Sequence, residues 1–252
     1  MTSLDELAGT ARGGTLYGIG VGPGDVRYLT LRAAGVVRTV DVLAFFAKRG
    51  RPGNSRAIVA PLVATGCEEL RLEYPVTEEI PAEDPDYQRQ MAGFYREAAA
   101  RLAERLKAGR SVGLLSEGDP FFYGSFMHMW RRLAPGFPVE VVPGVTGMSG
   151  CWTRANVPMT WGNDTLSVLP GTLGEEVLRQ RLSHADAAVI MKVGKNLPKI
   201  RRAVEAAGLL SRAVYVERGT MPDERIRPLA DCGEGRGAYF GMVLIPGEGR
   251  RL

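Results

Sequence analysis

The sequence YGIGVGPGD at residues 17–25 decides how the rest of the chain is interpreted. It ends a short apolar run, Thr15 to Val21, that predicts a buried strand. Every second residue from 18 to 24 is glycine, and a turn without side chains lets a ligand lie directly against the backbone. Pro23 fixes φ and removes one N–H donor, and Asp25 is placed to cap a following helix. The stretch therefore predicts a strand, a turn that holds a ligand, and a helix.

Familiar glycine-rich motifs fit this turn incompletely. A dinucleotide-binding G-x-G-x-x-G needs a glycine where Pro23 stands, and a phosphate-binding loop needs a G-K-[ST] that does not follow here. The G-x-G-x-G turn of a common methyltransferase fold fits the glycines better, but that fold needs an acidic residue at the end of the second strand. Asp41 precedes that strand, which favours a turn or cap role for it.

Strands and helices alternate through the first half of the chain, after residues 1–13, which have the character of a loose tail. This alternation predicts a mostly parallel α/β sheet, whose ligand-binding loops lie at the carboxyl ends of the strands. Two further loops of special composition, 116–124 and 143–147, follow predicted strands. The expected strands are Thr15–Val21, Val42–Phe46, Ile58–Leu62, Leu70–Val76, Ser111–Leu115 and Val139–Val142, and the expected helices are Leu29–Val40, Asp84–Gly109 and Ser125–Leu133.

The second half predicts another α/β domain with late antiparallel strands. The expected domains are 14–145 and 150–252, joined by the glycine-rich piece from Gly144 to Gly150. The expected strands are Asn163–Leu169, Ala187–Val193, Ala213–Glu217, Arg225–Leu229 and Tyr239–Ile245, and the expected helices are Glu175–Leu182 and Leu197–Ala207.

Composition excludes several classes of protein. The chain has 252 residues, 45% hydrophobic and 24% charged, which is typical of a globular protein. The net charge is only +4 and no basic run forms a nucleic-acid patch. Three dispersed cysteines and two histidines give neither a disulfide framework nor a metal site, so we expect no metal. With neither a signal-peptide pattern nor an apolar run long enough to span a membrane, we expect a cytoplasmic protein that does not contact membranes.

Several motifs in order resemble those of the tetrapyrrole methylase family. They are GVGPGD at 20–25, EGDPFFYGS at 117–125, VVPGVTGMSG at 141–150, MKVGKN at 191–196 and ERGT at 217–220. The pieces GDPFFYGSF and TWGNDTLSVLPGTL are similar to the members that methylate C-20 of precorrin-2 in cobalamin biosynthesis. The uroporphyrinogen-III members instead tend to have glycine where Glu117 stands here.

The resemblance implies a fold, a cofactor and a set of site residues. Family members have two α/β domains with S-adenosylmethionine in the cleft between them, leave S-adenosylhomocysteine as product, and usually form homodimers. The small-molecule substrate would be precorrin-2, which carries eight carboxylates. The implied cofactor contacts are Gly22, Pro23, Gly24, Glu117, Gly118, Asp119, Phe122, Thr146, Gly147, Met191 and Val193.

Methyl transfer to the electron-rich C-20 carbon needs positioning, exclusion of water and a base for the departing proton. Candidates for that base are Glu117, Asp25, Tyr123 and His128, each of which also has a structural interpretation. Arginines near predicted loops, which could bind the substrate carboxylates, are Arg27, Arg49, Arg51, Arg154 and Arg218. Three alternatives stay open: action on cobalt-containing factor II, action on another ring position, and a nucleotide-binding α/β module without this chemistry.

Overall fold

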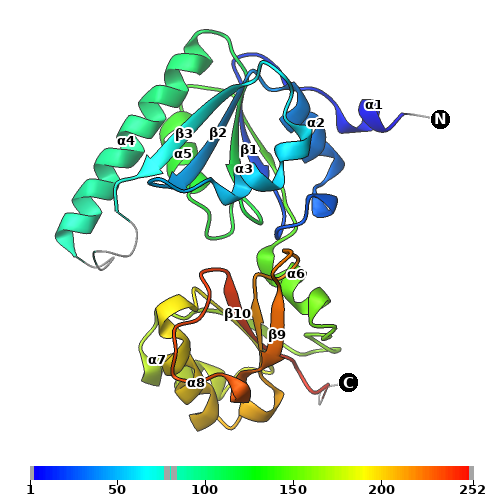
Figure 1. Ribbon diagram of the computed structural model, residues 1–252, viewed down its shortest axis with the longest axis vertical. Coiled ribbons are helices and arrows are strands. Elements are labelled where there is room, and N and C mark those ends of the chain that lie inside the picture. The colour runs from blue at the N-terminus through cyan, green and yellow to red at the C-terminus, as the bar shows by residue number, and fades with distance from the viewer. Residues whose placement is uncertain (1–2, 77–79, 81–83, 250–252) are drawn as a thin grey trace. The chain divides into compact units, whose positions relative to one another are not determined.

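The computed structural model describes residues 3–76, 80 and 84–249, and the chain divides into two compact units between Thr146 and Gly147. Figure 1 shows each unit as a sheet with helices packed on it. Residues 250–252 of the expected second domain lie outside the described residues.

The first unit is built on a five-stranded sheet with the order β3-β2-β4-β1-β5, in which every pairing is parallel. The predicted parallel sheet is confirmed. All of its strands therefore end at one edge, which we call the carboxyl edge. The strands are β1 (Leu16–Gly20), β2 (Val42–Lys48), β3 (Glu68–Tyr74), β4 (Val112–Ser116) and β5 (Val139–Val142).

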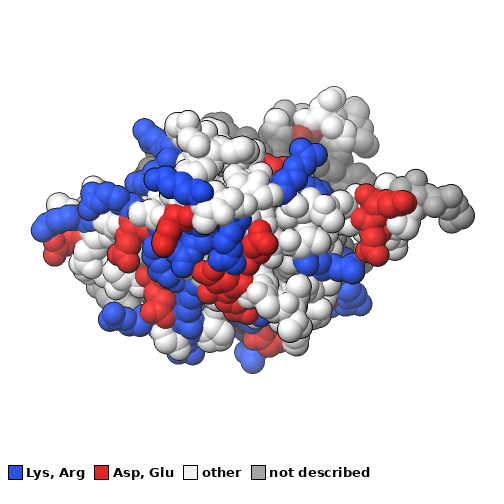
Figure 2. All heavy atoms as spheres, turned by 90° about the horizontal axis from the view of Figure 1, so that it is seen from above, with Lys and Arg blue, Asp and Glu red and all other residues white. Residues whose placement is uncertain are grey.

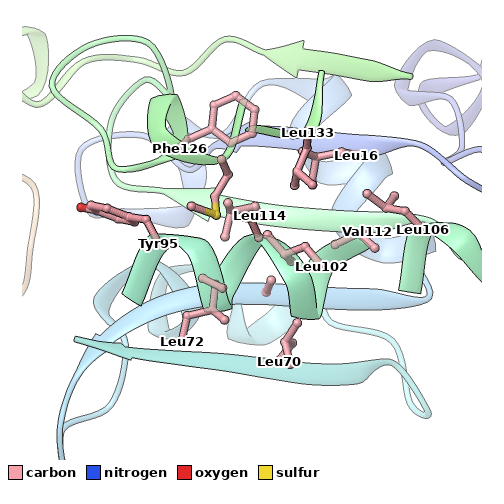
Figure 3. Close-up of a cluster of buried hydrophobic side chains, with 14 of the residues drawn as sticks. Leu16, Leu70, Leu72, Tyr95, Leu102, Leu106, Val112, Leu114, Phe126 and Leu133 are labelled. Carbon is pink, nitrogen blue, oxygen red and sulfur yellow. The ribbon is translucent and has the colours of Figure 1, made fainter. Parts of the chain in front are cut away.

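Helices cover both faces of this sheet because its strands are apolar on both sides. On one face Leu102 of α4 and Phe126 of α5 are buried in one cluster with Leu114 of β4, and Figure 3 shows this cluster. On the other face Val36 of α2 is buried in one cluster with Ile19 of β1. The helices are α1 (Leu4–Ala8), α2 (Leu31–Thr39), α3 (Asn54–Ile58), α4 (Pro85–Lys107) and α5 (Phe126–Leu133).

The second unit contains a mixed sheet with the order β6-β7-β10-β8-β9. β6 and β7 are parallel, whereas β10 pairs antiparallel with β7 and β8, and β9 with β8, so the predicted late antiparallel strands are confirmed. The elements are α6 (Gly147–Arg154), β6 (Leu166–Pro170), α7 (Glu175–Leu182), β7 (Ala187–Met191), α8 (Leu197–Ala206), β8 (Val214–Glu217), β9 (Arg225–Pro228) and β10 (Gly241–Ile245). Short 3-10 turns occupy Val26–Tyr28, Ala60–Leu62, Gly194–Asn196, Leu210–Arg212 and Leu229–Asp231.

The expectation of a loose N-terminal tail over residues 1–13 was wrong at the helix α1, and residues 1–2 lie outside the described residues. Ser3 and Glu6 form a reciprocal capping box, with Glu6 N–H donating to Ser3 Oγ at 3.2 Å and Ser3 N–H to Glu6 Oε2 at 2.7 Å. The helix α1 then packs on α2 at Gly35, where an added Cβ would lie 2.6 Å from the Ala8 carbonyl oxygen. The short helix thus depends on a tertiary contact that its own five residues do not reveal.

Two other segments also differ from expectation. Residues 58–62, expected as a strand, instead complete α3 and form a 3-10 turn, since Pro61 has no N–H to give a strand ladder. Residues 147–150, the second half of the expected glycine-rich join from Gly144 to Gly150, instead begin α6 at the start of the second unit. Asp25 caps the 3-10 turn that follows it, whereas Thr30 caps α2.

The opposite, amino edge of the first sheet carries paired charges. Glu68 accepts hydrogen bonds from Arg105 and Arg110, which lower the pKa of its carboxyl. Figure 2 shows basic and acidic side chains interspersed on the face it views, which is unlike the one-signed stripe of a nucleic-acid-binding surface. Among the described residues, no helix is long and apolar enough to cross a membrane.

Candidate active site

Three loops meet at the carboxyl edge of the first sheet: the first loop (21–25) follows β1, the second loop (117–124) follows β4, and the third loop (143–146) follows β5. The first two are joined backbone to backbone. Val21 N–H donates to the Ser116 carbonyl at 2.9 Å, and Gly22 and Gly118 exchange two hydrogen bonds of 3.3 and 2.8 Å. Since β1 lies between β4 and β5, the first loop is the centre of the group.

The third loop is held by Asp119 and by glycine packing. Gly144 N–H donates to Asp119 Oδ2 at 3.1 Å, while Asp119 Oδ1 accepts from Phe121 N–H at 2.9 Å. An added Cβ on Gly20 would lie 2.5 Å from the Gly144 nitrogen and 2.8 Å from the Gly118 carbonyl oxygen. Backbone therefore packs against backbone at the point where the three loops meet, and only glycine fits there.

The conformations of the loops explain several of the motif residues. Gly22 and Gly24 have φ values of 75° and 148°, which side-chain-bearing residues rarely adopt. Tyr123 has φ 56° although it is not glycine, and its ring meets Phe122 edge-on with centroids 5.0 Å apart. Such strain in a half-exposed tyrosine is typical of functional loops.

Glu117 occupies an unusual environment in the second loop. Its side chain reaches solvent, and Oε1 accepts a hydrogen bond of 3.2 Å from the buried Ser55 N–H. Protein atoms nevertheless surround the carboxyl closely, and this desolvation raises its pKa; the hydrogen bond from Ser55 opposes the shift. Glu117 is thus an accessible carboxyl that holds a proton more readily than an ordinary glutamate.

The other candidate bases have engaged side chains. Asp25 Oδ1 caps the 3-10 turn by accepting from Arg27 N–H at 2.8 Å, and both carboxyl oxygens accept from the Arg27 guanidinium. His128 stacks on Tyr95 of α4 with centroids 4.0 Å apart. Desolvation, aided by Arg132 and Arg131, lowers the pKa of His128, which favours a neutral imidazole.

The remaining predicted contacts lie at the junction and in the second unit. Thr146 ends the first unit, and Gly147 begins α6. In the second unit Met191 ends β7 and its carbonyl accepts from Gly171 N–H at 2.6 Å. The Val193 side chain is fully buried in the core of that unit, so a ligand contact at this position would have to use its backbone.

The sequence did not predict two residues that hold the second loop in place. Ser55 holds Glu117 from 62 positions away, and no local pattern signals that pairing. Ser125 follows the second loop, and its hydroxyl lies 2.7 Å from the Tyr74 hydroxyl and 3.3 Å from the Tyr95 hydroxyl. This cluster anchors the start of α5 to β3 and α4, and so fixes the end of the second loop.

Comparison with known proteins agrees with this geometry. Residues 15–231 match the family model of the tetrapyrrole (corrin/porphyrin) methylases. A precorrin-2 C(20)-methyltransferase from Sinorhizobium sp. is 54% identical over 234 residues, which cover 93% of this chain and 96% of that protein. A cobalt-precorrin-2 C(20)-methyltransferase from Salmonella typhimurium is 28% identical over 92% of this chain and 96% of its own.

The fold also matches solved structures. A uroporphyrin-III C-methyl transferase from Thermus thermophilus, complexed with S-adenyl homocysteine, superposes with a TM-score of 0.64 at 23% identity, covering 94% of this chain and 99% of that one. The family model spans most of the chain, and both the parallel first sheet and the three-loop edge lie inside it. The chain therefore belongs to the tetrapyrrole (corrin/porphyrin) methylase family.

Proposed function

We propose that this chain is a methyltransferase that moves a methyl group from S-adenosylmethionine to C-20 of precorrin-2, giving precorrin-3A in cobalamin biosynthesis. The observation that carries the proposal is the 54% identity to the Sinorhizobium precorrin-2 C(20)-methyltransferase over nearly the full length of both chains. The glycine motifs that bear the resemblance are also the ones that bring the three loops together.

The three loops fit a cofactor that lacks phosphate. They present backbone at Gly22, Gly118 and Gly144 where a phosphate site would carry a lysine. The carboxyl of Asp119 is engaged by two backbone N–H groups. We assign cofactor contacts in the first unit to the backbone of the first and second loops and to Phe122. The cofactor supplies an already activated sulfonium methyl.

The chain's own residues then position the reactants and exclude water from the reacting atoms. The hydrogen-bonded loops form a preorganised edge, so the loops lose little conformational entropy when the reactants bind. The half-exposed rings of Phe122 and Tyr123 stand beside this edge and would exclude water from the reacting atoms.

We assign the proton acceptor to Glu117. When a new carbon bond forms at C-20, the hydrogen on that carbon must leave as a proton. Glu117 combines contact with the loop cluster, solvent access and a raised pKa. A base whose pKa is closer to the working pH transfers protons more effectively than an ordinary glutamate.

One alternative substrate is the cobalt-containing form of the same macrocycle, as named for the Salmonella relative. The lower identity, 28% against 54%, favours the metal-free substrate. Incubation with methyl-labelled S-adenosylmethionine and either precorrin-2 or its cobalt complex, followed by carbon NMR, decides between them. Label at C-20 of the metal-free product is expected; label at another carbon, or turnover only with cobalt, would refute the proposal.

The resemblance further implies a cytoplasmic homodimer. Light scattering coupled to size-exclusion chromatography tests this assembly: a mass near twice 27.3 kDa is expected, and a mass of one chain would refute it.

A further inference from the structure

The turn that follows β2, residues 48–53, belongs to the same carboxyl edge as the three loops. β2 lies next to β4 in the sheet, so this turn is adjacent to the second loop. The two are also joined directly, because Ser55 at the start of α3 donates its N–H to Glu117. The turn contains two arginines, Arg49 and Arg51, both exposed.

The backbone of this turn is fixed in place. Arg51 N–H donates to the Lys48 carbonyl at 3.0 Å, and Gly50 has φ 67°. The Arg71 guanidinium on β3 donates to the carbonyls of Lys48 and Arg51, at 3.2 and 2.6 Å. An added Cβ on Gly53 would lie 2.6 Å from the Phe45 ring, so the turn is pressed onto its own strand. Arg71 thus stabilises the backbone of the turn that carries Arg49 and Arg51.

Ion pairing separates the five arginines that the sequence placed near predicted loops into two groups. Arg27 is paired with Asp25 at 2.6 Å, Arg154 with Glu224 at 2.9 Å and Arg218 with Asp223 at 2.6 Å. Within the part of the chain that the structure describes, Arg49 and Arg51 form no ion pair with an acidic side chain. They are thus the members of the group whose guanidinium groups can take up an external carboxylate without first releasing an internal one.

We propose that Arg49 and Arg51, held on the rigid 48–53 turn, bind carboxylate side chains of the tetrapyrrole and orient the macrocycle over the loop cluster. The inference rests on the proposed function for the identity of the substrate. It makes the two arginines positioning residues: they hold the periphery of the ring, while the reacting carbon lies at the loops. Because the turn is anchored to Glu117 through Ser55, the position of the ring periphery and that of the proposed base are set together.

The test compares Arg49→Ala, Arg51→Ala and the double variant with Arg12→Ala. Arg12 is a matched control: it is exposed, it forms no ion pair within the described residues, and it precedes β1 at the amino edge of the sheet. Binding of uroporphyrin III, a stable octacarboxylate porphyrin, is measured by fluorescence at several salt concentrations, and S-adenosylhomocysteine binding by calorimetry. For exposed ion pairs we expect about fivefold weaker porphyrin binding per single variant and about twenty-five-fold for the double variant.

The salt dependence of porphyrin binding should also become shallower in the double variant, because fewer charge contacts remain to be screened. S-adenosylhomocysteine affinity should not change, and KM for precorrin-2 should rise while kcat is retained. Wild-type porphyrin affinity in the double variant, or an equal loss in Arg12→Ala, would overturn the inference. If the wild type fails to methylate precorrin-2, the proposed function falls, yet the porphyrin assay still decides whether the turn binds polycarboxylates.

Discussion

Replacing Gly20 with alanine tests the central claim that the three loops touch through bare backbone. The new Cβ would lie 2.5 Å from the Gly144 nitrogen, 2.6 Å from its Cα and 2.8 Å from the Gly118 carbonyl oxygen. None of these atoms belongs to a flexible side chain that could move aside. Reaching an ordinary contact of about 3.4 Å from 2.5 Å requires a separation of about 0.9 Å between the end of β1, where the first loop begins, and the third loop.

Such a displacement has consequences for stability and for function. Overpacking of this kind costs about 2 kcal/mol, which corresponds to a fall in Tm of about 4–8 °C for a unit of this size. A misplacement of about 1 Å in a site that works by positioning costs about a hundredfold in kcat/KM. We therefore expect a folded but weakened protein with greatly reduced methyl transfer and weaker S-adenosylhomocysteine binding.

Gly136→Ala is the matched control for this experiment. Gly136 has no heavy atom within 4 Å of an added Cβ and its φ is not positive, so the same substitution should be neutral or slightly stabilising there. Differential scanning fluorimetry and calorimetry on both variants provide the readout. If Gly20→Ala matches Gly136→Ala in Tm, in S-adenosylhomocysteine affinity and in turnover, the loops are not in contact and the cofactor assignment fails.

Three further changes test single interactions. Asp119→Ala removes two carboxylate hydrogen bonds that hold the second and third loops, so calorimetry should show S-adenosylhomocysteine affinity reduced by about tenfold or more; unchanged affinity would contradict the role given to Asp119. Glu117→Gln should lower kcat sharply and remove the acidic limb of the pH–rate profile. Since desolvation by the surrounding protein atoms raises the pKa of Glu117, its stabilising contribution exists at low pH and is lost as pH rises; the variant should therefore have a higher Tm at about pH 8 and an unchanged Tm at about pH 4. Ser125→Ala should cost about 1 kcal/mol by denaturant unfolding through the loss of its tyrosine partners, whereas a neutral result would mean that this cluster does not anchor the second loop.

The sequence predicted the fold class well because hydrophobic periodicity reports it locally. The cap pair Asp84-Pro85 marks the start of α4, and the apolar run of β4 is bounded by turn residues. The errors occurred where a short segment depends on its surroundings. Five residues of α1 are too few to be helical alone, and they are held by packing at Gly35.

The candidate site was only partly predictable, for a different reason. Gly22, Pro23, Gly118 and Asp119 were proposed as cofactor contacts because they lie in short local motifs that resemble those of the family. The partners that give them their function are distant: Ser55 lies 62 residues from Glu117, and Gly144 lies 25 residues from Asp119. Likewise, the sequence placed five arginines near loops but could not separate those paired within the chain from Arg49 and Arg51, because the pairing depends on tertiary contacts.

The same distance explains why the opening motif could not be interpreted alone. A single glycine-rich turn is common in α/β chains, and Pro23 stands where a dinucleotide-binding motif needs glycine. The need for glycine at position 20 is explained by Gly144 and Gly118, because a side chain on Gly20 would collide with the backbone of the second and third loops. A side chain on Gly20 or on Gly144 would meet backbone atoms of the other two segments, so both positions need glycine at the same time. The diagnostic signal is therefore the ordered set of three motifs, and the chemistry it supports is recognition by shape and backbone instead of by a charged phosphate cradle.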